Sequence, residues 1–146
     1  MNAPMALTPA GDILANINEM EWLDVGGGSY FKVLRRCEKA GQWVVYVRME
    51  PGARFQPHRH EGWGQFFITK GELIYDVGSA PAGTYGFEPI FAVHHEAGCE
   101  VETEMLFMGE GAVTYFTPDG GIDYVMNVQT LKAVTEGTAA LDVSPT

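Results

Sequence analysis

Short apolar stretches alternate with turn residues along most of the chain. From Tyr30 onward, segments rich in Val, Ile, Tyr, Phe and Trp are interrupted about every 8–12 positions by glycine and other turn residues. Segments of this length and composition are typical of the strands of a sandwich or barrel. The pattern therefore predicts an all-β fold with strands over 30–34, 42–49, 65–69, 72–77, 84–87, 101–108, 112–116 and 122–128.

Turn residues place the connections between these strands. Pro51-Gly52 ends the second strand, and Lys70-Gly71 is a tight turn. Residues 78–83 are expected to form a loop. The turn over 118–121, Pro-Asp-Gly-Gly, is expected to join two paired strands into a hairpin.

The two ends of the chain depart from the strand pattern. Thr8-Pro9 could cap a short helix, but residues 1–21 could equally form an arm that lies on a neighbouring subunit. The apolar residues that would share one side of such a helix are Ile13, Leu14, Ile17 and Met20. We expect the last fifteen or so residues to fray after about one short helical turn. No repeat or linker divides the sequence, so we expect a single domain over 1–146, with a tail over 137–146.

Composition is that of a soluble globular protein, with 46% hydrophobic residues and a mean hydropathy of −0.05. No apolar run approaches the roughly 18 residues that a membrane-spanning helix needs. The N-terminus lacks the basic and then apolar layout of a signal peptide, so we expect a cytoplasmic protein without membrane partners. Cys37 and Cys99 are not spaced as a redox or zinc pair and are interpreted as buried reduced thiols.

The net charge of −10 is unevenly distributed. Residues 1–71 carry 8 Lys and Arg against 7 Asp and Glu (+1), whereas residues 72–146 carry 1 against 12 (−11). A nucleic-acid-binding protein needs a basic face, and the second half offers only Lys132. We therefore exclude nucleic acid as a partner and interpret the acidity as a solubility feature.

The four histidines fall in two places, His58 with His60 and His94 with His95. Residues two apart on a strand point to the same face, so His58 and His60 can present both imidazoles to one point. A third imidazole from a strand folded alongside would complete a set of nitrogen donors for a transition metal. A solvated surface pair would look identical, but the second cluster about 35 residues later favours a metal site.

The glycines and proline around these histidines resemble the two motifs of the cupin superfamily. The first motif, Gly, five residues, His-x-His and a later turn glycine, is matched by Gly52, His58, His60 and Gly71. The second, Gly, five residues, Pro and then His, is matched by Gly83, Pro89 and His94. The match runs directly from Gly52 to about Gly98. It implies a double-stranded β-helix, or jelly-roll barrel, with a metal inside it held by His58, His60 and His94.

Two positions depart from the cupin motifs. Gly64, followed by Gln65, stands where the family usually has a glutamate ligand, and Gly98 stands where it usually has asparagine. Without that glutamate, three neutral imidazoles would leave a divalent ion its full +2 charge and about three open positions. Such a centre is expected to favour an anionic, bidentate oxygen ligand.

Within the cupins the chain is most similar to the acetylacetone-cleaving dioxygenases and the related 2,4'-dihydroxyacetophenone dioxygenases. The similarity is carried by 87–94, 104–107 and 111–115. It implies a mononuclear non-haem Fe(II) enzyme that uses O₂ to cleave a C–C bond of a small 1,3-dicarbonyl or hydroxyketone. We expect the protein to be a homodimer or a tetramer. Zn²⁺ or Ni²⁺ could replace iron in the isolated protein, because both outcompete Fe²⁺ at nitrogen sites.

Several residues are candidates for supporting roles. Gln65 could hydrogen-bond a ligand or a bound water, or could equally face solvent. His95 is expected to point away from His94. A carboxylate that orients an imidazole or supplies a fourth ligand could come from Glu88, Glu104 or Asp76, although a solvated acid is the favoured interpretation for each.

The aromatic residues and one arginine complete the set of candidates. Those expected to line or pack the barrel are Phe66, Tyr75, Phe87, Phe91, Phe107 and Tyr115. Arg48 lies on an otherwise apolar predicted strand and is a candidate for substrate contact.

Two rival functions remain open. One is a Zn or Mn cupin isomerase or hydrolase that works as a Lewis acid without O₂. The other is a metal-sensing or metal-binding module, like the cupin domains that resemble the zinc-binding anti-sigma factor group. A closed zinc site needs four protein ligands, and the sequence makes only three evident, which favours a catalytic site.

Overall fold

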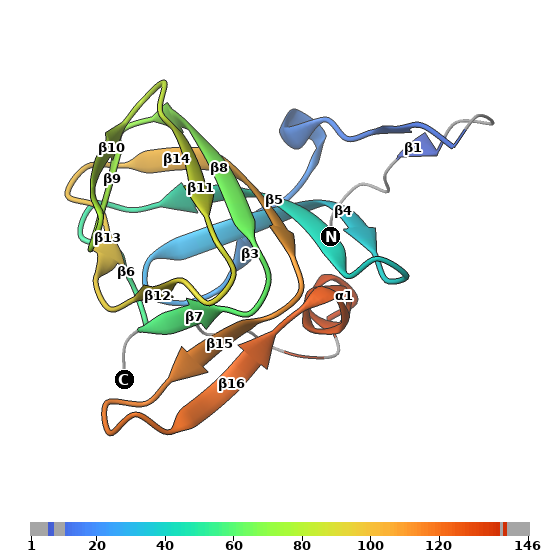
Figure 1. The fold of residues 1–146 in the computed structure, drawn as a ribbon. Coiled ribbons are helices and arrows are strands. Elements are labelled where there is room, and N and C mark those ends of the chain that lie inside the picture. The colour runs from blue at the N-terminus through green and yellow to red at the C-terminus, as the bar shows by residue number, and fades with distance from the viewer. Residues whose placement is uncertain (1–5, 8–10, 138, 140–146) are drawn as a thin grey trace.

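The structure is a computed structural model that describes residues 6–7, 11–137 and 139. Antiparallel sheets wrap around one interior, and a short helix packs beside them (Figure 1). The largest sheet has the order β11-β8-β14-β5-β4-β3. Its strands are β3 (Leu23–Asp24), β4 (Ser29–Cys37), β5 (Gln42–Met49), β8 (Gly64–Lys70), β11 (Tyr85–Glu88) and β14 (Thr103–Glu110).

Two four-stranded sheets complete the barrel. One has the order β12-β7-β15-β16, and its strands are β7 (His58–His60), β12 (Val93–His94), β15 (Val113–Phe116) and β16 (Ile122–Met126). The other has the order β10-β9-β13-β6, and its strands are β6 (Arg54–Phe55), β9 (Glu72–Tyr75), β10 (Gly78–Pro81) and β13 (Ala97–Gly98). A small hairpin of β1 (Ala6–Leu7) and β2 (Ile13–Leu14) and a 3-10 turn, η1 (Ile17–Glu19), precede them.

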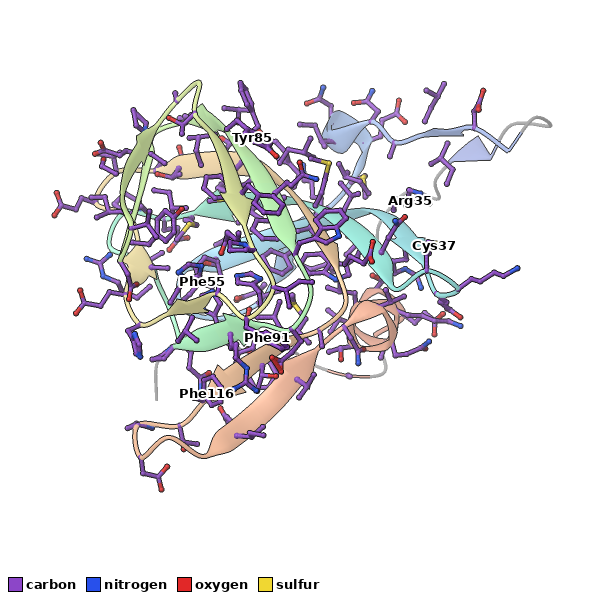
Figure 2. The ribbon with its side chains drawn as sticks, in the orientation of Figure 1. Arg35, Cys37, Phe55, Tyr85, Phe91 and Phe116 are labelled. Atoms are coloured by element: carbon purple, nitrogen blue, oxygen red, sulfur yellow. The ribbon has the colours of Figure 1, made fainter. Side chains whose placement is uncertain are left out.

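Alternation along the strands decides which side chains fill the interior. In β5 the buried residues are Trp43, Val45, Val47 and Met49, and the residues between them are less buried. Successive side chains on a strand point to opposite faces, so one residue in two faces the core. Buried residues from the large sheet, from β9 and β15 and from the C-terminal helix form one apolar cluster. Figure 2 shows side chains filling the space that the sheets enclose.

Several expectations about the elements are confirmed. The strand over 42–49 is observed with those bounds, and β15 pairs with β16 across the predicted turn over 118–121. At Lys70-Gly71 the chain turns out of the large sheet into β9 of another sheet. Gly71 has a φ of 76°, and a side chain there would meet the backbone of Thr103, with a Cβ only 2.8 Å from its Cα. Only glycine fits this turn without strain.

Two expectations are wrong for the described residues. Residues 78–81 form β10, paired with β9, rather than a loop. Of the two alternatives for the N-terminal segment, the helix is wrong at Ile13-Leu14, which forms a strand paired with Ala6-Leu7. The short helical turn expected before the tail is observed as a longer helix, α1 (Val128–Thr135), which begins where the strand over 122–128 was expected to end. The rest of the expected tail, 138 and 140–146, lies outside the described residues.

The helix α1 is explained by its cap and its apolar side. The Asn127 side chain accepts a hydrogen bond from the Thr130 amide at 3.0 Å, which satisfies one of the free amides at the helix start. Val128, Leu131 and Val134 are buried, at the spacing of one helix face. Among the described residues, no helix is both long and apolar enough to cross a membrane.

Candidate metal centre

Two adjacent antiparallel strands bring three imidazoles together. His58 and His60 lie on β7 and are buried, while Arg59 between them is less so. β12 pairs with β7 so that His94 is the direct cross-strand partner of His58. The ring centroids are 5.2 Å apart for His58 and His60, and 5.4 Å apart between His94 and each of them. The structure therefore gathers the three sequence candidates around one point inside the barrel.

A carboxylate lies among the histidine rings. Glu88 Oε2 is 2.7 Å from His60 Nε2 and 2.5 Å from His94 Nε2, and Glu88 is only 6% exposed. The interpretation of Glu88 as a solvated acid is wrong. The reason is strand alternation on β11, where Tyr85 and Phe87 face outward and Glu88 faces inward.

Glu88 comes from the strand next to the one on which the cupin motif would have its glutamate. Gly64 on β8, where the motif would have glutamate, is the direct cross-strand partner of Glu88 on β11. A Cβ at Gly64 would lie 2.8 Å from Cζ of Phe107, whose ring stacks on the His60 ring at 6.1 Å between centroids. Phe107 thus fills the space of a side chain at 64, and the neighbouring strand supplies the carboxylate.

The loop between Glu88 and His94 is fastened to the backbone of His60. The Phe91 amide donates to the His60 carbonyl at 2.7 Å, and the His60 amide donates to the Ala92 carbonyl at 2.9 Å. Phe91 has a φ of 68°, a left-handed conformation that is uncommon for a residue other than glycine. These bonds hold the loop that sets the positions of Glu88 and His94 relative to His60.

The protonation states of the site suit a cation. Burial, followed by the repulsion of His60, lowers the pKa of His58 from 6.5 to about 4, so this imidazole is neutral at pH 7. Its Nδ1 lies 2.9 Å from the Gln56 carbonyl, which assigns the proton to Nδ1 and leaves the Nε2 lone pair free. Burial raises the pKa of Glu88, but His60 and His94 outweigh this and lower it to about 2, so the carboxylate is ionised.

The donor atoms are close together but are not satisfied by one another. One nitrogen from each of His58 and His60 and one oxygen of Glu88 lie within 4.8 Å of one another, and His94 meets this group through its contact with Glu88. Apart from their close approach to Glu88, His60 Nε2 and the two ring nitrogens of His94 have no hydrogen-bond partner among the described residues. A divalent cation would satisfy His60 Nε2, one ring nitrogen of His94 and the Glu88 carboxylate at once, so the residues fit a metal.

A cavity of about 70 Å³ adjoins the donor atoms. That is room for several waters or a very small organic molecule. Apart from the three histidines and Glu88, the residues that line the cavity are apolar or aromatic. They include Phe55, Tyr75, Met105, Phe107 and Tyr115. The expectation that aromatic residues line or pack the barrel is therefore confirmed for Tyr75, Phe107 and Tyr115, and for Phe66, which is buried in the core.

The same expectation is wrong for two aromatic residues. Phe87 is 55% exposed and Phe91 is 69% exposed. Phe87 alternates with the inward-facing Glu88, and Phe91 lies in the loop that follows β11, so neither faces the core.

The remaining candidates lie away from the donor atoms. Gln65 alternates with the buried Gly64 and Phe66, faces outward and accepts a hydrogen bond from the Tyr85 hydroxyl. Glu104 lies on the same outer side, 3.9 Å from Lys70 Nζ. Arg48 also faces outward, stacked between the rings of Trp22 and Tyr30 at 4.8 and 4.7 Å. None of these three lines the cavity.

Asp76 and His95 form a separate surface pair. Asp76 accepts hydrogen bonds from the amides of His95 and Glu96, and these lower its pKa to about 2 against the opposing effect of burial. The His95 side chain is 71% exposed and points away from the other histidines, as expected. Asp76 therefore organises a turn and supplies no ligand to the cluster.

Comparisons with known proteins identify the family to which the fold belongs. The model of the family described as the ChrR Cupin-like domain matches residues 10–114. The chain is similar to the acetylacetone-cleaving enzyme of Acinetobacter johnsonii, with 26% identity over 102 residues, which cover 66% of this chain and 67% of that protein.

Solved structures with the same fold include two that cover most of the chain. The acetylacetone dioxygenase of Acinetobacter johnsonii superposes with a TM-score of 0.73 and 24% identity, over 77% of this chain and 80% of that one. An RmlC-like cupin from Ralstonia eutropha JMP134 gives a TM-score of 0.73 with 17% identity, over 88% and 91%. The expected jelly-roll cupin fold is thereby confirmed.

Proposed function

We propose that this chain, which belongs to the ChrR Cupin-like family, is a metal-dependent dioxygenase that cleaves a C–C bond of a small 1,3-dicarbonyl or hydroxyketone with O₂. The observation that carries the proposal is a buried group of three imidazoles and one carboxylate beside a small, mostly apolar cavity. The similarity to an acetylacetone-cleaving enzyme supports the choice of reaction.

The residues that would hold the metal are His58, His60 and His94, with Glu88 as a fourth donor. Fe(II), the metal we propose, would supply the redox chemistry that O₂ requires and the Lewis acidity that polarises a carbonyl. The Glu88 carboxylate is ionised, so it would cancel one of the two positive charges of the ion. The preference for an anionic ligand is therefore weaker than three neutral imidazoles alone would give.

Glu88 has a second proposed role as the base of the reaction. A β-diketone must lose a proton to become the electron-rich enolate that reacts with O₂. Glu88 is the one carboxylate among the described residues that line the cavity, so its oxygens are the proton acceptor nearest a bound substrate. The apolar walls from Phe55, Met105 and Phe107 would exclude water and hold the substrate beside the donor atoms.

Oxygen consumption tests the proposed reaction. Protein loaded anaerobically with Fe(II) is expected to consume O₂ when acetylacetone is added, and to release two carbonyl fragments per O₂. The measurement is an oxygen electrode trace with product analysis, and the control is the same protein loaded with Zn²⁺. No O₂ uptake across a panel of β-diketones and hydroxyacetophenones would refute the proposal. Turnover without O₂ would favour a Lewis-acid isomerase or hydrolase.

A metal-binding module without catalysis is the second candidate, and Glu88 is the observation that favours it. Three histidines and Glu88 make four protein donors, the number that a closed zinc site requires, so a shortage of ligands no longer argues against that function. The adjoining cavity favours the open, catalytic alternative. Metal analysis of protein made in iron-supplemented, chelator-free medium separates the two, since tightly held zinc without turnover would support the module.

The proposed self-association of the chain is supported by the outer face of the large sheet. Two cross-strand rows cross it, one of Phe87, Gln65, Met108 and Val44 and one of Tyr85, Phe67, Leu106 and Tyr46. Every member of the two rows except Gln65 is apolar or aromatic. Phe67, Tyr85 and Phe87 are all exposed. Polar rows bound this apolar band on both sides, with Gln42 and Glu110 at one edge and Arg48, Glu104 and Lys70 at the other. An apolar centre with a polar rim is typical of an interface.

Replacing Phe67 by glutamate is expected to convert a dimer into a monomer at micromolar concentration, because it buries a charge at the centre of the apolar band. Light scattering coupled to gel filtration measures the mass. The matched control is Ile122→Glu, which alters an exposed apolar residue on β16, outside the band. A wild-type protein that is monomeric at 100-fold higher concentration would contradict this assignment.

A further inference from the structure

Tyr115 is a buried phenol beside the metal candidates. It lies on β15 as the direct cross-strand partner of His58, so its side chain shares the inward face of that histidine. Its ring centroid is 5.4 Å from that of His58, and the other face of the ring stacks on Tyr124 at 4.6 Å. Tyr115 is only 4% exposed and lines the cavity.

The hydroxyl of Tyr115 has no hydrogen-bond partner among the described residues. The same holds for Tyr75, which lines the cavity from β9 with its ring edge-on to His94 at 5.0 Å. Burying a hydroxyl without a partner costs folding free energy, so buried phenols are usually satisfied by protein or water. Tyr115 is buried and Tyr75 is half-buried, and both hydroxyls lie at one small cavity without a partner among the described residues.

Other polar groups on the cavity wall are already occupied. Trp43 Nε1 donates to the Gly111 carbonyl at 3.0 Å, and His58 Nδ1 is bonded to the Gln56 carbonyl. One nitrogen each of His58 and His60 and one oxygen of Glu88 lie within 4.8 Å of one another at the candidate metal position, and His94 Nε2 contacts Glu88. The two phenols are the hydroxyl groups that the wall still offers to a ligand, beside His94 Nδ1, which also has no partner among the described residues.

We infer that Tyr115, from the side of His58, and Tyr75, from the side of His94, donate hydrogen bonds to oxygen atoms of the bound substrate. The inference rests on the proposed function for the identity of that substrate. It assigns the cavity to small molecules that carry carbonyl or enolate oxygens next to a short apolar body. The phenols distinguish such a ligand from a hydrocarbon of the same size, because only oxygen satisfies their O–H groups.

Binding of acetylacetone to the Zn²⁺-loaded protein tests this inference without any turnover. Tyr115→Phe removes one oxygen atom and leaves the ring to stack on Tyr124. It is expected to weaken acetylacetone binding at least about tenfold by calorimetry, since the lost bond is to a charged oxygen. Tyr75→Phe is expected to weaken binding as well, and the double variant more than either. The melting temperature of Tyr115→Phe without ligand is expected to be unchanged or higher, because the hydroxyl bonds no described residue and its burial costs folding free energy.

The matched control is Tyr46→Phe, whose hydroxyl contacts Thr69 Oγ1 at 2.8 Å on the outer face of the large sheet, and which should bind like wild type. Equal binding by Tyr115→Phe and wild type overturns the inference, and so does a wild-type protein that binds neither acetylacetone nor acetate. A fall in melting temperature with unchanged affinity overturns it too, since the hydroxyl would then be structural. Weakened binding by a protein that consumes no O₂ with Fe(II) supports the phenol roles and refutes the proposed reaction.

Discussion

Replacing His60 by alanine is expected to remove the metal and to reduce dioxygenase turnover to background. His60 is one member of the group whose donor atoms lie within 4.8 Å of one another, and its Nε2 contacts Glu88 Oε2. Without it, the two remaining imidazoles come from different strands and Glu88 loses one of the rings that it contacts. Metal content by mass spectrometry and O₂ uptake with acetylacetone measure the two effects.

The matched control for His60→Ala is His95→Ala. His95 is the fourth histidine of the chain, it is adjacent to His94, and it is exposed beside Asp76. This variant should keep full metal content and full turnover. If His60→Ala retained stoichiometric metal, the proposed ligand set would be wrong, whatever its activity. Circular dichroism of both variants separates metal loss from unfolding.

Glu88→Gln is expected to produce the second largest effect, by keeping the shape of the side chain and removing its charge. Loss of a carboxylate beside metal-binding imidazoles typically lowers metal affinity by about 10–100-fold. Loss of a general base lowers turnover by about 10²–10⁴-fold. We therefore expect kcat to fall by at least about 100-fold even when Fe(II) is saturating. Metal titration and kcat at saturating metal measure the two roles separately.

Glu104→Gln is the control for the charge change at Glu88. Glu104 carries the same carboxylate on β14 but faces the outer side of the sheet, beside Lys70. The Glu104→Gln variant should bind metal and turn over substrate as the wild type does. A Glu88→Gln protein with wild-type kcat would refute the proposed base, and unchanged metal affinity would refute its role as a donor. The two results are independent, because one role can be present without the other.

The pairing of Gly64 with Glu88 shows how a carboxylate can reach the histidine rings from a neighbouring strand. The two residues are cross-strand partners on β8 and β11, so a side chain from either can reach toward the same histidines. Phe107 occupies the space at Gly64 and stacks on His60, which leaves β11 as the source of the acid. The position of Glu88 beside the histidines could not be predicted by counting residues from the motif glycines, because that count says nothing about which strand pairs with β8.

Local pattern was sufficient for the features that depend on neighbours in sequence. The strand over 42–49 follows from alternation, and the inward side of His58 and His60 follows from their separation by one residue. The turn over 118–121 follows from residues that favour turns. The length of the helix near the end of the chain was harder to predict from the sequence. α1 is stabilised by burial of Val128, Leu131 and Val134, and this burial requires the rest of the fold.

The sequence by itself determined the barrel fold, the inward pair His58 and His60, and the resemblance that singles out His94. Only the tertiary structure decided which of twelve acids in the second half of the chain meets these rings, and it selected Glu88. It also turned Phe87 and Phe91 outward and placed Tyr115 beside His58. The physical reason is that alternation fixes which residues of one strand share a side, whereas burial and distance depend on strand pairing between segments far apart in sequence.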